Sequence, residues 1–119
     1  MSWESVKHMI EYSISIAKEA IERENLLRKI KKLPNNADQI IAYLELCKPS
    51  HCAYTFEIES DLRMNRSVIY KTMKKLRKKK LIKIKKHESY PASNIWCLDM
   101  EELEILREKG LVPKRWDSG

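Results

Sequence analysis

An apolar stripe along the first quarter of the chain predicts one long helix. Residues 2–32 contain neither Gly nor Pro, and Ser2 is a suitable N-cap. Apolar or small side chains recur every three or four residues, at Val6, Ile10, Ser13, Ala17 and Ala20, and the stripe is broadened by Met9, Ile14, Ile16 and Ile21. A helix of about 28 residues is about 40 Å long, longer than a small domain can cover. The pattern favours a dimer in which the same helix of a second chain covers the stripe. The alternative is a helix that folds back across its own domain.

Two shorter helices separated by a brief turn are predicted in the middle of the chain. Thr55 is a candidate N-cap for the first helix and Asn65 for the second. Helical spacing gives each of them a face to bury, which carries Ile58 and Leu62 in the first helix and Ile69, Met73 and Leu76 in the second. The pattern is typical of a helix-turn-helix whose second helix is amphipathic.

A two-stranded wing is predicted after the second helix. Residues 81–85 alternate apolar and basic side chains, and residues 95–98 form a second β-prone run. A polar connection with Pro91 and Asn94 joins the two runs. Asp99 followed by Glu102 then resembles a capping box, which predicts a last helix ending at Gly110.

Positive charge is concentrated in the second helix and the first wing strand. The net charge of the chain is +7, yet residues 63–86 contain twelve Lys or Arg and no Asp or Glu, so the remaining residues sum to −5. Such polarisation favours a surface that meets a polyanion, because each neutralised phosphate releases condensed counterions. The alternative is a solvated lysine-rich helix that keeps the protein in solution.

Residues 37–98 resemble the winged helix-turn-helix transcriptional regulators, the broad class that includes the MarR, ArsR and PadR families. The resemblance is carried by Thr55, Glu57, Ile58, Leu62, Met64 to Ser67, Ile69 to Lys71, Leu76, Leu81 and Ile82. One position departs from the pattern: the residue before Leu81 is usually Gly, and here it is Lys80. Lys80 therefore either adopts a left-handed backbone at a modest cost or ends the helix differently.

The resemblance implies a mainly α (α+β) fold, a winged helix-turn-helix with a long N-terminal helix and a C-terminal helix for dimerisation. We expect a single winged-helix domain over residues 1–119, composed of a dimerisation helix at 2–33, the core at 36–98, a C-terminal helix at 99–110 and a tail at 111–119. The low Gly content and abundant Ile, Lys and Glu resemble a thermophile's composition. Small proteins of this kind are familiar from crenarchaea and their viruses.

Charge and resemblance together predict a homodimeric, sequence-specific regulator that binds double-stranded DNA. The candidate DNA-binding residues are Asn65, Arg66, Ser67, Tyr70, Lys71, Lys74, Lys75, Lys78, Lys83, Lys85, Lys86, His87 and Tyr90. Arg66 is the candidate for a bidentate guanine contact, and the lysines would set the phosphate register. The candidate dimer-interface residues are Val6, Ile10, Ala17, Ile21, Leu103 and Leu106. The alternative is a protein-interaction or assembly module, or a non-specific nucleic-acid binder.

Three cysteines leave several roles open. Cys47, Cys52 and Cys97 are most simply buried thiols, but a disulfide between two of them is an alternative. A metal site that uses His51 beside Cys47 and Cys52 would need a fourth ligand such as Cys97 or His87. With such a site the protein would be a metal- or redox-sensing repressor. The simplest expectation includes no metal, cofactor or small-molecule ligand.

Catalytic and membrane functions find no support in the sequence. It contains no Gly-rich phosphate loop, no G-x-S-x-G and no H-E-x-x-H. No apolar run reaches 18 residues, and the N-terminus lacks a signal-peptide profile. We therefore expect a cytoplasmic protein that is not an enzyme and does not bind a membrane.

Overall fold

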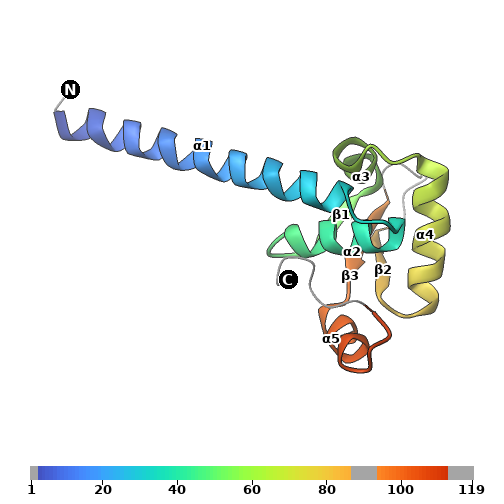
Figure 1. Ribbon diagram of the computed structural model, residues 1–119. Coiled ribbons are helices and arrows are strands. Elements are labelled where there is room, and N and C mark those ends of the chain that lie inside the picture. The colour runs from blue at the N-terminus through green and yellow to red at the C-terminus, as the bar shows by residue number, and fades with distance from the viewer. Residues whose placement is uncertain (1–2, 87–93, 113–119) are drawn as a thin grey trace.

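The computed structural model describes residues 3–86 and 94–112. In this part of the chain the elements follow in the order α1 (Trp3–Lys31), α2 (Asn36–Leu46), β1 (Cys52–Tyr54), α3 (Thr55–Leu62), α4 (Arg66–Lys78), β2 (Ile82–Lys86), β3 (Ile95–Leu98) and α5 (Met100–Glu108). Figure 1 shows α1 extending away from a body formed by all the other elements. The architecture is a winged helix-turn-helix, as the sequence predicts.

The core of the body lies between α2, α3, α4 and the sheet. Helix α2 runs through its centre, and Ile40, Tyr43 and Leu44 are fully buried. Ile58 of α3 and Ile69 of α4 are also fully buried, which confirms the apolar faces predicted for these two helices. Burial of such side chains is the main favourable term that holds α3 and α4 in a fixed relation.

A three-stranded antiparallel sheet supports the wing. The strand order is β1-β3-β2, so β3 pairs with both of its neighbours. The wing strands β2 and β3 lie within one residue of their predicted positions, and their register shifts between Ile84 and Lys86. Strand β1 was not predicted, because three residues are too few for a recognisable alternation.

Two of the predicted helix starts are confirmed, and one is wrong. The side chain of Asn65 accepts a hydrogen bond from the backbone N–H of Ser67 (3.0 Å), and that of Asp99 accepts one from Glu102 (3.1 Å). Thr55, however, is not an N-cap: it is the first residue of α3, and it is fully buried. Its hydroxyl oxygen accepts a hydrogen bond from Nε1 of Trp96 (2.7 Å), which ties the start of α3 to β3.

Of the two alternatives open for Lys80, the left-handed backbone is the one observed, with φ of 63°. The N–H of Leu81 bonds to the carbonyl of Leu76, and the N–H of Lys80 bonds to that of Arg77. These two bonds form a Schellman-type end to α4, a motif that usually has Gly at the left-handed position. The chain therefore enters β2 through a turn that a lysine makes at some conformational cost.

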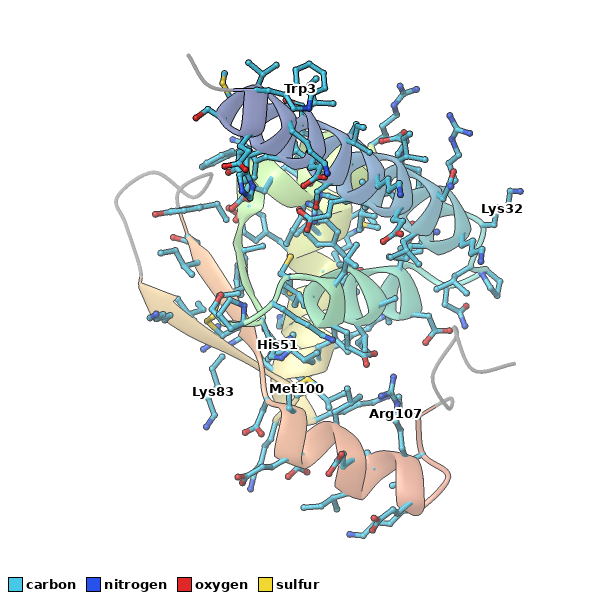
Figure 2. The ribbon with its side chains drawn as sticks, turned by 90° about the vertical axis from the view of Figure 1, so that its left-hand side faces the viewer. Trp3, Lys32, His51, Lys83, Met100 and Arg107 are labelled. Carbon is cyan, nitrogen blue, oxygen red and sulfur yellow. A yellow bond between two sulfur atoms is a disulfide. The ribbon has the colours of Figure 1, made fainter. Side chains whose placement is uncertain are left out.

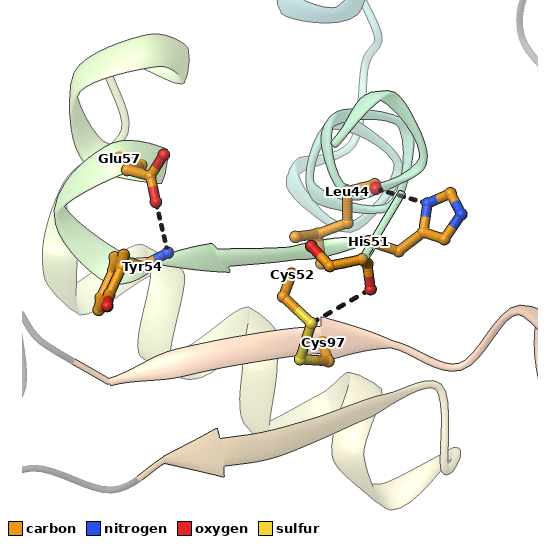
Figure 3. The surroundings of a disulfide bond; sticks show 7 residues. Leu44, His51, Cys52, Tyr54, Glu57 and Cys97 are labelled. Carbon is orange, nitrogen blue, oxygen red and sulfur yellow. Dashed lines mark hydrogen bonds between the residues drawn. A yellow bond between two sulfur atoms is a disulfide. The ribbon is translucent and has the colours of Figure 1, made fainter. Parts of the chain in front are cut away.

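Cys52 and Cys97 form a disulfide between β1 and β3, at positions that are paired in the sheet (Figure 3). Of the alternatives open in the sequence, the disulfide therefore holds for these two residues. Cys47 is a free, half-buried thiol, and burial raises its pKa. Within residues 3–86 and 94–112, no group of three or more His, Cys, Asp or Glu side chains is arranged to hold a metal ion.

Helix α1 is anchored to the body only near its C-terminal end. Leu27 and Ile30 are buried in the core, whereas every residue from Lys7 to Asn25 is exposed. Among the described helices, α1 included, none combines the length and hydropathy needed to cross a membrane. The other described residues therefore leave the apolar stripe of α1 largely uncovered.

Candidate nucleic-acid interface

Helix α4 has one buried side and one basic side. Ile69, Thr72, Met73 and Leu76 are buried against the body. The opposite side is exposed and carries Ser67, Lys71, Lys74, Lys75 and Lys78. The helix contains no acidic residue, so no charge within α4 itself offsets its positive surface. In Figure 1, α4 stands at the edge of the body farthest from the free end of α1.

The N-terminus of α4 is fixed by a cap and an ion pair. Asn65 caps the helix through its side-chain oxygen, which also accepts a hydrogen bond from the hydroxyl of Ser67 (3.1 Å). Nε of Arg66 donates to Oε1 of Glu59 on α3 (2.7 Å). This carboxylate raises the pKa of the Arg66 guanidinium. Three predicted DNA-binding residues thus lie together at the helix end that can reach base edges.

Tyr70 lies partly inside the body. Its ring packs against that of Trp96, with centroids 6.0 Å apart, and its side chain is half-buried. The hydroxyl is buried and has no hydrogen-bond partner among the described residues. The ring therefore fixes α4 against β3, and only part of its surface remains exposed.

Strand β2 adds two exposed lysines at the root of the wing, on the face opposite to Ile82, which is buried in the core. Lys83 and Lys85 are both exposed and, two residues apart, follow the alternation of the strand. Figure 2 shows the side chain of Lys83 projecting outward from the sheet. Its ammonium lies 3.5 Å from the carboxylate of Asp99. Lys86 is described by its backbone alone, and the predicted sites at His87 and Tyr90 lie outside the described residues.

Asp99 joins the wing to the last helix. Its carboxylate accepts a hydrogen bond from the backbone N–H of Glu102 and pairs with Lys83. Both interactions favour the charged form, and the backbone hydrogen bond is the larger cause of a lowered pKa. The charge of Lys83 is therefore partly balanced on the side that faces α5.

Two side chains at this surface were missed in the sequence. Glu59 contacts Arg66 from seven residues earlier, across the turn between α3 and α4. Trp96 lies on β3, distant in the sequence, yet it donates a hydrogen bond to Thr55 and packs against the ring of Tyr70. An acid seven residues before an arginine at a predicted helix start is a signal that the sequence contains, but the contacts of Trp96 depend on strand pairing.

The predicted dimer residues fall into two groups. Ile10, Ala17 and Ile21 are exposed on α1, and Val6 is half-buried beside them. Leu103 is instead fully buried in the core of its own chain, and Leu106 is half-buried against that core. The described α5 therefore offers Leu106, and not Leu103, as surface for a second chain.

Comparison with solved structures supports the fold. The chain is similar to Sco3205, a MarR family transcriptional regulator from Streptomyces coelicolor, in a crystal structure of its complex with DNA. The alignment has a TM-score of 0.52 and 18% sequence identity, and it covers 92% of this chain and 71% of Sco3205. No protein-family model matches the sequence, and no curated protein matches it either.

Proposed function

We propose that this protein is a homodimeric, sequence-specific regulator of transcription that binds double-stranded DNA in the cytoplasm. In this proposal α4 enters the major groove, and the wing contacts the backbone or the minor groove. The observation that carries it is the structure of α4 itself. The helix presents an exposed, acid-free row of lysines on one side and is fixed by a buried apolar ridge on the other.

A lysine-rich helix that only aided solubility would not need this construction. The N-terminus of α4 is capped by Asn65, and the positive end of the helix dipole lies beside the exposed Arg66 and Ser67. Lys83 and Lys85 on β2 add exposed positive charge at the root of the wing. A rigid helix with polar groups at its exposed N-terminus suits direct contact with base edges, and the flanking lysines suit contact with phosphates.

The fold similarity supports the same function. Sco3205 has the same overall fold and is a transcriptional regulator solved in complex with DNA.

Selection from a random pool of duplex DNA tests the proposal directly. Bound duplexes are sequenced and the selected site is then titrated by fluorescence anisotropy at several salt concentrations. We expect a nearly palindromic site with half-sites about one helical turn apart, because a two-fold dimer presents two copies of α4. We also expect affinity to fall steeply with salt, because lysine–phosphate contacts release counterions.

A matched pair of lysine variants locates the surface. Lys74→Ala removes an exposed charge from α4, and Lys109→Ala removes an exposed charge just after α5. The first variant should weaken binding to all sequences and reduce the salt slope by about one, and the second should leave both nearly unchanged. Binding without sequence preference at any salt concentration would contradict a specific regulator.

The proposed dimer rests on the uncovered face of α1. Ile10 and Ile14 are each 50% exposed, and Met9 and Ile21 are each 62% exposed. Val6, Met9, Ile10, Ser13 and Ile14 lie together on this face and line a shallow apolar hollow. Solvated monomers rarely expose an apolar patch of this length. A second α1 is the simplest occupant because an isologous pair covers both stripes at once.

Sedimentation equilibrium tests this interface with two aspartate substitutions. Ile10→Asp places a charge in the apolar hollow and should convert the dimer to a monomer. His8→Asp is the control, because His8 lies on the polar side of α1 with Glu4, Lys7 and Glu11. A wild-type monomer at micromolar concentration, or a dimer that withstands Ile10→Asp, would refute the proposed interface.

A further inference from the structure

Among the described residues, Arg66 is held by a well-defined contact with Glu59. Its Nε donates to Oε1 of Glu59 at 2.7 Å, while the two side chains remain 49% and 28% exposed. The ion pair connects the first residue of α4 with α3 across the turn of the helix-turn-helix. Its place at the outer surface sets it apart from the ion pair between Arg107 and Glu45, which lies against the core.

The contact uses the guanidinium nitrogen that a guanine contact does not need. Arginine has five N–H donors, and a bidentate contact with guanine O6 and N7 can use the terminal nitrogens. Glu59 engages Nε, so the two N–H groups at the tip of the guanidinium, one on each terminal nitrogen, stay available for a bidentate contact. A carboxylate on Nε also fixes the plane of the guanidinium, which otherwise turns freely on a flexible stem.

The backbone on both sides of the contact is fixed as well. The carbonyl of Glu59 accepts a hydrogen bond from the N–H of Met64, and Arg63 takes the left-handed conformation with φ of 50° at the end of α3. Asn65 caps α4 directly before Arg66. Glu59 and Arg66 therefore sit on two helix ends joined by a rigid turn, so a shift of their relative position is opposed by the turn itself.

We propose that Glu59 is a positioning residue for base reading. It orients Arg66 toward one base pair and disfavours nonspecific binding of Arg66 to phosphate. The inference rests on the proposed function and adds a residue that carries specificity to it. Glu59 acts in two ways that can be separated. Its hydrogen bond orients Arg66, and its negative charge repels the phosphate backbone wherever the arginine has no guanine to meet.

The two effects predict opposite changes in two measured affinities. Without the oriented arginine, discrimination at one base position should fall. Without the carboxylate charge, affinity for random DNA should rise. A residue that merely stabilised the fold would lower both affinities together, so the pattern distinguishes positioning from stability. An exposed ion pair of this kind contributes little to folding, so the variants should fold.

The experiment measures binding of three variants to the selected site, to the site with each base pair changed, and to random duplex. We expect Glu59→Ala to reduce discrimination at one position in each half-site by about three- to tenfold, and Arg66→Ala to reduce it there by roughly tenfold or more. Glu59→Gln keeps an acceptor for Nε and loses the charge. It should retain most of the discrimination while binding random DNA several-fold more tightly.

The double variant Glu59→Ala/Arg66→Ala and the control Glu104→Ala complete the design. In the double variant the loss of discrimination at that base position should equal that of Arg66→Ala alone, because Glu59 affects base reading only through Arg66. Glu104 is an exposed acid on α5, so its removal should leave discrimination unchanged. If the wild type selects a site but Glu59→Ala discriminates as well as the wild type does, the positioning role is overturned and the proposed function stands. If the wild type selects no sequence, the proposed function and the inference both fail.

Discussion

Helices α1 and α4 carry the same kind of apolar stripe, but the described part of the chain covers only the stripe of α4. In α4, Ile69 and Met73 are fully buried against the body. In α1, Ile10 and Ile14 keep half of their surface exposed, although their spacing is as regular. An apolar stripe thus indicates that a face will be covered without saying which chain will cover it. Helix α1 has 29 residues and most of its length extends beyond the body, which is why we propose a second chain as the partner of its stripe.

The largest expected difference between the two stripes is in stability. Ile69→Ala should lower the free energy of unfolding by about 2–4 kcal/mol, because it removes buried methyl groups and leaves a cavity. Ile14→Ala should change it by less than about 0.5 kcal/mol in dilute protein, where α1 has no partner. Urea denaturation of the two variants and the wild type measures both values.

Protein concentration should affect the two variants differently. If α1 pairs with a second chain, the loss of stability caused by Ile14→Ala should grow as the protein becomes more concentrated. The loss caused by Ile69→Ala should remain large even in dilute protein, because Ile69 is buried within its own chain. Equal costs at the lowest concentration would show that the α1 stripe is covered within its own chain. A cost of Ile14→Ala that never varies with concentration would argue against the dimer.

The same contrast explains what could be predicted from the sequence. Local signals found α4, its cap at Asn65, the wing strands and the start of α5 at Asp99, because these depend on spacing and on side chains within a few residues. Contacts between distant segments were not predictable. Trp96 donates a hydrogen bond to the hydroxyl of Thr55 and packs against the ring of Tyr70 only because β3 folds back on the body. Leu103 is buried in the core because α5 does the same. The pattern at Thr55 resembled an N-cap because a buried hydroxyl and a capping hydroxyl look alike in sequence.

Ion pairs extend the comparison between the body and α1. Arg107 forms two hydrogen bonds with Glu45, at 2.6 and 3.2 Å, and the two side chains are only 15% and 10% exposed. Arg107→Ala should therefore cost about 3 kcal/mol of stability, because it leaves the Glu45 carboxylate buried without its cation. Arg23 on α1 pairs with Asp61 at 3.4 Å in a more exposed place, so Arg23→Ala should cost about 1 kcal/mol or less. Thermal unfolding of both variants would contradict this ranking if the two costs were equal.

The pH dependence of stability reports on the body, since the described partners of Asp99 belong to β2 and α5. Asp99→Ala should cost about 1 kcal/mol at neutral pH through loss of the cap. The pKa of Asp99 is lower in the folded state than in the unfolded state. The carboxylate therefore stabilises the fold at pH values above its pKa in the unfolded state, and this contribution is lost as the pH falls below about 4. The gap between wild type and variant should narrow in acid. Asp99→Asn keeps the capping oxygen, so it should lose only the charge-dependent part, and a gap that stays constant to pH 3 would argue against this account.

The smallest effect concerns the end of α4, where the chain turns into the wing. Lys80 has φ of 63°, a conformation that costs a lysine about 1–2 kcal/mol and a glycine almost nothing. Glycine also has more freedom to lose on folding, so Lys80→Gly should stabilise the protein by a net of about 0.5–1 kcal/mol. Lys79→Gly is the matched control: its φ is −85°, so glycine there should destabilise the protein by a similar amount. Urea denaturation measures both changes in stability. Each variant also removes one positive charge from the most basic segment of the chain. If both substitutions changed stability in the same direction, the lost lysine charge, and not the left-handed backbone, would determine the effect.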